Sequence, residues 1–287
     1  MSAAPVFLRQ LIFSKRRAFQ VIFLASTLTT QVPTADAATI RARYSVSYLG
    51  VQLGELIIVN NVGPVNYEAD LNARLSGLAA VARSFNISIK SKGALKGGLI
   101  RPSSYLLSQT GSETRTIRVA LAGGNAKAAE IEPPFEKSGP LVPLVEEHKR
   151  NVVDPLSALI MPLAQSGGEL GPSVCNRTLR LFTGATRADI EFAYAGYEDL
   201  KSKAYTGSVA VCSVSYKPIA GYNPDSTMTK SMMANQDIKV RLAPLSDVPY
   251  AMLISATVPL PLGTARLALE EYSIEPAQMV SNRASAR

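Results

Sequence analysis

The chain of 287 residues is 47% hydrophobic and 18% charged, which is typical of a folded globular protein and excludes a disordered or collagen-like chain. A single histidine and two cysteines exclude any zinc site with several histidine ligands and any cysteine-ligated cluster. The formal net charge of +8 is mild, and the chain has neither tryptophan nor interleaved basic and aromatic residues. We therefore expect a folded protein with no metal, no cofactor and no nucleic-acid partner.

The first 37 residues have the pattern of a secretory signal peptide. Basic residues at Arg9 and at 15–17 precede an apolar run at 18–28, and Ala35-Asp36-Ala37 forms a small-x-small cleavage site. The apolar run is shorter than the roughly 20 residues that a membrane-spanning helix needs. We predict cleavage after Ala37 and release into the periplasm, with no transmembrane segment left in the mature chain. The pair Arg16-Arg17 leaves twin-arginine export as the alternative to the general secretory route.

Most of the remaining chain alternates apolar and polar residues with the period of two that a half-buried β-strand requires. In the first strand, for example, Tyr44, Val46 and Tyr48 fall on one face. Turn residues such as Gly63-Pro64 and Gly123-Gly124 separate the alternating segments. The thirteen predicted strands contain Tyr44 to Tyr48, Ile117 to Leu121, Ile238 to Leu242 and Leu267 to Leu269, together with residues 53–62, 65–75, 84–91, 99–109, 126–132, 174–183, 186–196, 205–216 and 249–260.

Many short strands with few helices predict an all-β fold, either an antiparallel β-spiral or a half-open β-barrel. The stretch 132–143 contains four prolines and predicts an extended connector. Both sides of this connector continue the same antiparallel pattern, so we expect a single domain at 38–275, with a split near residue 150 as the alternative. Residues 276–287 have no apolar period, and we expect them to form a disordered tail.

Two segments depart from the strand pattern. Residues 76–83 are rich in alanine and predict a turn or two of helix. Asp154-Pro155 is a stronger start signal, because aspartate is a favourable N-cap and proline at the first helical position loses no hydrogen bond. Apolar residues then recur at helical spacing, although Pro162 should kink or end the helix: Leu156, Leu159, Ile160 and Leu163. We predict a short helix near 154–165 that plugs one open end of the β core, with a docking or gating helix as the alternative.

The only two thiols of the chain are Cys175 and Cys212. In an oxidising compartment an even pair is expected to form a structural disulfide. A redox-active pair is the alternative, although such pairs more often have the spacing Cys-x-x-Cys at the start of a helix.

A set of short motifs is spread in order over nearly the whole mature chain: Tyr44 to Gly50 with Gly54, Gly77-Leu78, Leu99 with Pro102 and Tyr105, Val153 to Ala158, Cys175 with Cys212, Pro249-Tyr250, and Gly263-Thr264. This set resembles the family known as domain of unknown function 3108, found in proteobacterial envelopes. The resemblance implies a β-rich periplasmic protein and assigns no substrate. More distantly, the layout is similar to envelope-integrity proteins that curl a sheet into a β-spiral with one disulfide, and to lipoprotein carriers with a half-open barrel.

The sequence offers little for catalysis. The one possible imidazole base, His148, lies in the charged stretch 146–150, and Ser157 lacks both a Gly-x-Ser-x-Gly elbow and a lysine three residues later. Asp154 is expected to cap a helix and not to act as an acid. We therefore expect no enzymatic activity and no catalytic residue, with a hydrolase that uses His148 as a minor alternative.

Two binding hypotheses remain; we favour the first and keep the second as the alternative. In the first, the protein supports the cell envelope by binding a protein partner, with the proline-rich connector and the helix after Asp154 as contact elements. In the second, the β core encloses a lipid or another apolar ligand, as half-barrels do. Small residues on the last strands favour room inside: Ala251, Ala256, Ala265 and Ala268. An outer-membrane barrel is disfavoured, because 7% aromatic residues are few for two girdles.

Overall fold

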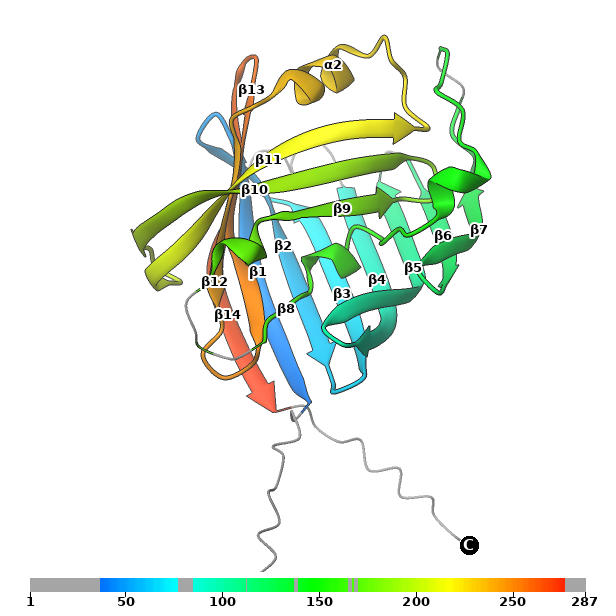
Figure 1. Ribbon diagram of the computed structural model, residues 1–287. Coiled ribbons are helices and arrows are strands. Elements are labelled where there is room, and N and C mark those ends of the chain that lie inside the picture. Colours follow the sequence, from blue (N-terminus) through cyan, green and yellow to red (C-terminus); the bar gives the residue numbers. More distant parts are fainter. Residues whose placement is uncertain are drawn as a thin grey trace, which may run out of the picture. The chain divides into compact units, whose positions relative to one another are not determined.

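The computed structural model describes residues 37–76, 85–111, 113–136, 139–164, 167 and 170–276 (Figure 1). Three predictions lie outside these residues: the signal peptide before Ala37, the short helix at 76–83 apart from its first residue, and the tail after Pro276. No helix of the described part is long and apolar enough to cross a membrane.

The described chain is built almost entirely from antiparallel strands, which confirms the all-β prediction. Thirteen of the fourteen strands have six or more residues, as the alternation predicted, and β8 has two. The strands are β1 (Ala38–Tyr48), β2 (Val51–Val62), β3 (Asn66–Leu75), β4 (Phe85–Lys96), β5 (Leu99–Gly111), β6 (Arg115–Ala122), β7 (Asn125–Glu132), β8 (Met161–Pro162), β9 (Arg177–Phe182), β10 (Arg187–Lys201), β11 (Thr206–Ala220), β12 (Ile238–Pro244), β13 (Tyr250–Leu260) and β14 (Gly263–Pro276). The helical elements are the 3₁₀ turns η1 (Glu146–Lys149), η2 (Ser157–Leu159) and η3 (Pro172–Val174), and the α-helix α2 (Thr227–Ala234).

All the long strands belong to one sheet, made of two meanders. In the first, β1 to β7 pair in chain order, and in the second, β9 to β14 do the same. The two meanders join where β1 pairs with β14, from Ala38 opposite Pro276 to Tyr48 opposite Ala265. The edges of the sheet are therefore β7 and β9.

The sheet curls until its two edges approach each other, which confirms the predicted half-open barrel (Figure 1). Phe182 of β9 is fully buried in a cluster with Ile117 and Val119 of β6. In the turn after β9, Gly184 has a φ of 96°, and a Cβ there would lie 2.8 Å from Ile117 Cγ2, so this close approach requires glycine. The segment 152–153 lies between the edges: the N–H of Val152 donates to Gly124 O, and Val153 exchanges hydrogen bonds with β9.

The predicted helix near 154–165 is wrong. Only the 3₁₀ turn η2 forms, and the chain is extended again from Ile160 into β8. Asp154 does accept hydrogen bonds from the N–H groups of Leu156 and Ser157, as a cap would. The helix ends after one turn because Pro162 cannot continue it and because Met161 and Pro162 pair with β13.

The one α-helix among the described residues, α2, lies elsewhere and was not predicted. Its N-cap is Ser226, whose side chain accepts a hydrogen bond from Thr229 N at 3.3 Å. The serine was a readable start signal, but the helix buries no residue, so its sequence has no apolar stripe to reveal it.

Cys175 follows η3 and bonds to Cys212 in the middle of β11, with an S–S distance of 2.01 Å. Both sulfur-bearing side chains are fully buried in the larger core cluster. The bond closes a loop that contains β9 and β10, and thus ties the edge strand of the sheet to a strand further inside.

We expect the double variant Cys175→Ser/Cys212→Ser to unfold at a lower temperature than the wild type. A loop with a sequence separation of 37 stabilises the folded state by about 4 kcal/mol in the chain-entropy model, which corresponds to roughly 10 °C for a domain of this size. Calorimetry of the oxidised wild type and the variant measures this shift. Equal unfolding temperatures would show that the bond constrains nothing that the sheet does not already hold.

Candidate functional site

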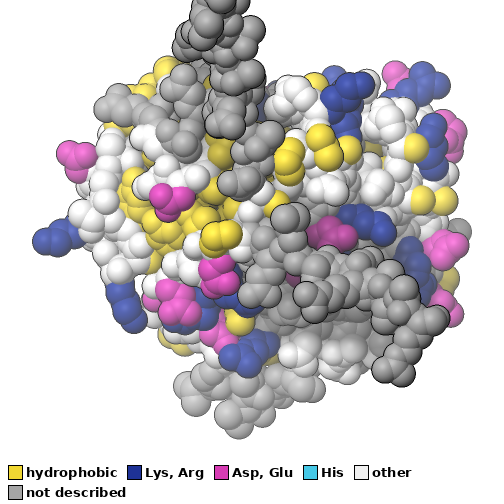
Figure 2. Space-filling model, turned by 90° about the horizontal axis from the view of Figure 1, so that it is seen from below, with side chains coloured by type: hydrophobic (Ala, Val, Ile, Leu, Met, Phe, Trp, Pro, Cys, Tyr) yellow, Lys and Arg dark blue, Asp and Glu magenta, His cyan; other side chains and the backbone are white. Residues whose placement is uncertain are grey.

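An apolar cavity lies at the end of the barrel where β1 and β13 begin and β2 ends. Figure 2 views this end of the molecule and shows hydrophobic side chains gathered at the surface. The cavity has a volume of about 40 Å³. Its walls are formed by Ile40, Ala42 and Tyr44 of β1, Ile58, Asn60 and Val62 of β2, Leu159, Ile160 and Met161, Leu245, and Tyr250, Ala251, Met252 and Leu253 of β13.

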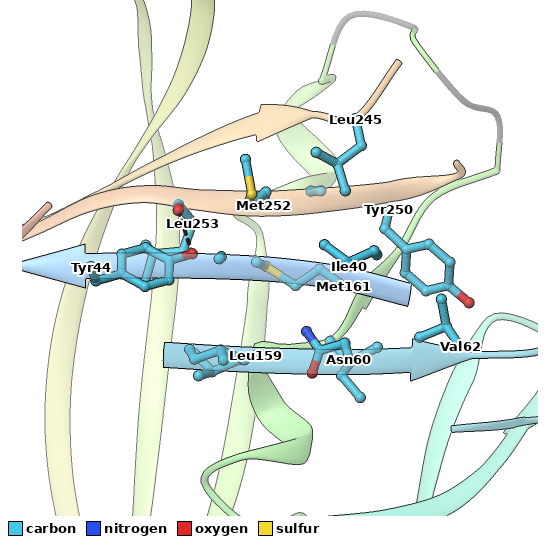
Figure 3. A pocket seen from close by; sticks show the side chains of 14 residues that line it. Ile40, Tyr44, Asn60, Val62, Leu159, Met161, Leu245, Tyr250, Met252 and Leu253 are labelled. Carbon is cyan, nitrogen blue, oxygen red and sulfur yellow. Dashed lines mark hydrogen bonds between the residues drawn. The ribbon is translucent and has the colours of Figure 1, made fainter. Parts of the chain in front are cut away.

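The chain itself closes this cavity with a short segment, residues 157–164, which we call the strap. Figure 3 shows Leu159 and Met161 of the strap facing the side chains of β1 and β2. The strap is attached to β13 by the two residue pairs of β8 and by a hydrogen bond of 2.7 Å from Leu163 N to Pro249 O. Ile160 and Met161 of the strap also belong to the larger core cluster, so the strap is joined to the barrel both by backbone bonds and by apolar packing.

Two polar side chains of the cavity differ in how they are satisfied. The hydroxyl of Tyr44 donates to Leu253 O at 2.9 Å, and burial raises the pKa of this phenol well above its ordinary value. The Oδ1 atom of Asn60 is buried and accepts no hydrogen bond from the described residues. A buried acceptor without a hydrogen bond destabilises the folded state by about 1–3 kcal/mol. A ligand that places a hydrogen-bond donor next to this oxygen would therefore bind favourably.

The cavity in its closed form is small. A void needs roughly 10–15 Å³ to hold one water molecule, so the space beside the strap accepts a few water-sized groups and no whole acyl chain. If Leu159 and Met161 swing away, the surface under them becomes an apolar groove between β2 and β13. The arrangement is therefore suited to binding an apolar group, and it offers no acid, base or nucleophile to act on one.

The strap begins at a buried polar cluster formed by Asp154, Ser157, Ser91 and Tyr67. Asp154 is fully buried, and its Oδ1 accepts hydrogen bonds from Ser91 Oγ at 2.6 Å and from two backbone N–H groups of the strap region. Its Oδ2 accepts from Ser157 Oγ at 2.5 Å. Because the proton of Ser157 is used in that bond, the hydroxyl of Tyr67 donates to Ser157 Oγ at 2.6 Å. The carboxylate thus fixes the strap to β3 and β4.

The cluster depends on close backbone packing at Gly93 of β4. A Cβ at this position would lie 2.3 Å from Arg101 O and 2.8 Å from the hydroxyl oxygen of Tyr67. Only glycine leaves the phenol room to reach Ser157. Gly93 lies where the register between β4 and β5 shifts, which is a usual place for glycine in a sheet.

Burial raises the pKa of Asp154 above its ordinary value of 3.8, against the lowering effect of its hydrogen bonds to Ser157, Ser91 and Leu156. Since the folded pKa exceeds the unfolded one, the folded state binds the proton more tightly. The contribution of Asp154 to stability is therefore largest at low pH. It declines as the pH rises from about 4 through the folded pKa, and is constant above it.

We expect the Asp154→Asn variant to remove this decline, because an amide does not titrate. The difference in unfolding free energy, wild type minus variant, should fall between pH 4 and 8. Urea titrations at several pH values measure it. A difference that rises with pH would show that the carboxylate is stabilised by its hydrogen bonds more than it is destabilised by burial.

The residues considered for catalysis are not assembled into a site. His148 lies in η1, partly exposed, and its Nδ1 accepts a hydrogen bond of 3.3 Å from Val145 N. The neighbouring Glu146 pairs with Lys149 at 2.5 Å. Ser157 is buried in the cluster around Asp154, and Cys175 and Cys212 are bonded to each other. Within the described ranges no group of three or more potential metal ligands occurs.

The sequence predicts room beside Ala251, which does line the cavity, but it does not predict where the cavity lies or what forms its other walls. The signal that could have drawn attention to it is Asn60, a polar residue that stands at an inward position of a strand otherwise lined by Ile58 and Val62. Tyr67 was also missed, because its role depends on a partner 90 residues away.

Three comparisons place the chain among known proteins. The model of the family described as "Protein of unknown function (DUF3108)" matches residues 43–266. The crystal structure of a beta-barrel-like protein of the domain of unknown function DUF1849 from Brucella abortus is similar over 84% of this chain and 99% of that chain, with 8% sequence identity and a TM-score of 0.47. No curated protein matches the sequence.

Proposed function

Since the chain belongs to the DUF3108 family, whose description names no activity, we propose from the geometry of the molecule that it is a non-enzymatic binding protein for an apolar ligand. The signal-peptide pattern of the first 37 residues supports export, with the mature chain acting in the periplasm in support of the cell envelope.

The observation that carries the proposal is the cavity under the strap. Its walls are aliphatic apart from the phenols of Tyr44 and Tyr250 and the amide of Asn60. Ligand sites are mostly apolar with a few polar groups that orient the ligand, and the buried Oδ1 of Asn60 is such a group. The ligand that fits this chemistry is a hydrocarbon chain next to a hydrogen-bond donor, such as the amide or hydroxyl of a lipid.

A ligand of this kind must displace the side chains of the strap. Leu159 and Met161 fill the groove in the closed form, and methionine adapts its shape readily to a changed environment. The buried carboxylate of Asp154 holds one end of the strap, so the movement is limited to the part after Ser157. Binding and strap opening are therefore coupled.

A protein partner is the second candidate. The connector between β7 and η1 exposes three large apolar side chains, Phe135, Leu141 and Val145. Exposed apolar groups on an extended proline-containing segment are typical of protein contacts. The guanidinium of Arg115 lies 4.2 Å from the ring centroid of Phe135 and holds this part of the connector in place.

Native mass spectrometry of the protein purified from a periplasmic extract tests the first candidate. We expect an apolar adduct of one per chain, released only by unfolding and identified by lipid analysis. The Ala251→Val variant adds two methyl groups to the cavity wall and should lose most of the adduct. The Leu159→Ala variant enlarges the cavity and should retain or increase it, at a cost in stability of about 2–3 kcal/mol.

The control is Ala120→Val, the same change at an exposed position on β6, which should leave the adduct unchanged. A bare mass for the wild type and for Leu159→Ala would overturn the apolar-ligand proposal and leave the protein-partner candidate. An adduct that persists in Ala251→Val would place the ligand elsewhere in the molecule.

The absence of enzymatic activity is tested by His148→Ala. We expect neither the unfolding temperature nor the ligand occupancy to change, because the substitution removes only one side-chain hydrogen bond, which lies on a partly exposed turn. A gain or loss of ester hydrolysis in a panel of acyl substrates, wild type against variant, would revive the hydrolase that uses His148.

A further inference from the structure

Two hairpin turns form an apolar tip at the end of the molecule opposite the cavity. The turn Leu49-Gly50 joins β1 to β2, and Pro261-Leu262 joins β13 to β14. The turns are neighbours because β1 pairs with β14, and Leu49 N donates to Thr264 O. Figure 1 shows both hairpins at the same end of the barrel, beside α2. We define the tip by its exposed aliphatic side chains Leu49, Val51 and Leu262, which are 61%, 54% and 81% exposed.

The tip carries no charge along either hairpin. Residues 48–54 and 257–265 contain no Asp, Glu, Lys or Arg. A hairpin turn in water normally consists of polar residues and glycine, since these suit the turn geometry and the solvent. Leucine, valine and proline at this position therefore indicate an environment other than water.

The backbone conformation of Leu49 supports this conclusion. Its φ is 52°, in the left-handed region, where leucine costs roughly 1–2 kcal/mol and asparagine or glycine costs less. Most of the side chain is exposed, so burial within the barrel does not offset this cost. Part of the side chain lies against Gly263 of the neighbouring hairpin, and the rest faces outward. Strained residues of this kind concentrate at functional sites.

Two cations lie just below the tip. They belong to one row of paired residues that runs across four adjacent strands. The row consists of Lys239 on β12, Thr257 on β13, Arg266 on β14 and Ser47 on β1. Lys239 and Arg266 are exposed, and neither has a salt bridge to a described residue. The carboxylate that interacts with Lys239 is Glu198, which forms its ion pair with Arg241. Asp237 lies two residues before Lys239 in the chain.

We propose that the apolar tip inserts into the surface of a membrane that contains anionic lipid. The hairpins would place Leu49, Val51 and Leu262 among the upper acyl segments, while Lys239 and Arg266 contact phosphate groups. Apolar insertion combined with cations at head-group level is the general pattern of interfacial binding. A membrane fits the tip better than a protein does, because the side chains are aliphatic and protruding, whereas protein interfaces favour aromatic residues and Arg at their centre.

The geometry also separates this surface from the ligand cavity. β13 runs from Tyr250 at the cavity to Leu260 at the tip, and a strand of this length spans roughly 30 Å. Membrane contact at the tip therefore leaves the cavity end facing away from the bilayer.

Flotation with vesicles of phosphatidylethanolamine and phosphatidylglycerol tests the proposal. The protein is purified after export and its N-terminus is checked by mass spectrometry, since the apolar run 18–28 would bind vesicles by itself. We expect the wild type to float with these vesicles and much less with phosphatidylcholine. Leu262→Asp should weaken binding roughly tenfold or more, because a buried leucine side chain is replaced by a charge.

Leu49→Asn is the second variant, and it removes one apolar side chain while suiting the left-handed turn. We expect weaker flotation and an unfolding temperature equal to or above that of the wild type. Leu99→Asp is the matched control: it changes an exposed leucine at the start of β5, and should bind as the wild type does. Ala251→Val should also bind normally, which separates tip insertion from ligand exchange at the cavity.

Binding that is equal for Leu262→Asp and Leu99→Asp would overturn the proposal, because insertion would then not involve the tip. Failure of the wild type to float with either vesicle would also overturn it. The charge-reducing variant Lys239→Gln/Arg266→Gln should lose the preference for phosphatidylglycerol, and a preference that remains would show that these cations do not contact the lipid.

Discussion

The pairing of β1 with β14 is the contact on which the architecture depends. Each meander pairs its strands in chain order, and within the described sheet these two strands alone join one meander to the other. Their eleven paired residues place β2 and β13 on either side of one seam. The cavity lies at one end of this seam and the apolar tip at the other. Both candidate surfaces therefore follow from a contact between the beginning and the end of the domain.

The strap depends on a second constraint, the burial of Asp154. A carboxylate enclosed by the fold is tolerated only when hydrogen bonds replace its water, and here the hydroxyls of Ser91 and Ser157 and two backbone N–H groups do so. Asp154, Leu156 and Ser157 belong to one segment. The bond from Ser91 to Asp154 and the bond between Tyr67 and Ser157 are therefore the ones that tie this segment to β4 and β3. The cluster thus keeps one end of the strap in place, and the pairing of Met161 with Ala251 attaches the following part to β13.

Much of the fold could be predicted from the sequence, because inward and outward residues alternate in nearly every strand. In β6, for example, Ile117, Val119 and Leu121 are buried and their neighbours are not. The alternation does not exclude a helix after Asp154, because the apolar residues there have a spacing that suits a helix as well as a 3₁₀ turn followed by an extended segment. The pairing of Met161 with Ala251 decides between them, and no local pattern reveals it.

The candidate site was harder to predict for a related reason. The cavity is defined by residues from five separate segments, and its volume depends on how closely their side chains pack. Sequence alternation shows which side chains point inward, but it does not show which of them meet. In the sequence Asn60 is an ordinary strand residue. The structure shows that its Oδ1 is buried and accepts no hydrogen bond from the described residues.

The β1–β14 pairing also determines the order in which the protein can fold. The two strands are more than 200 residues apart, so the sheet cannot become continuous until the last strand has left the ribosome. Until then β1 is an open edge with unpaired backbone groups, next to a finished β2. A chain in this state is prone to pair with another copy of itself. Because β1 stays unpaired until β14 has been synthesised, we expect the newly made chain to bind chaperones that cover exposed β edges.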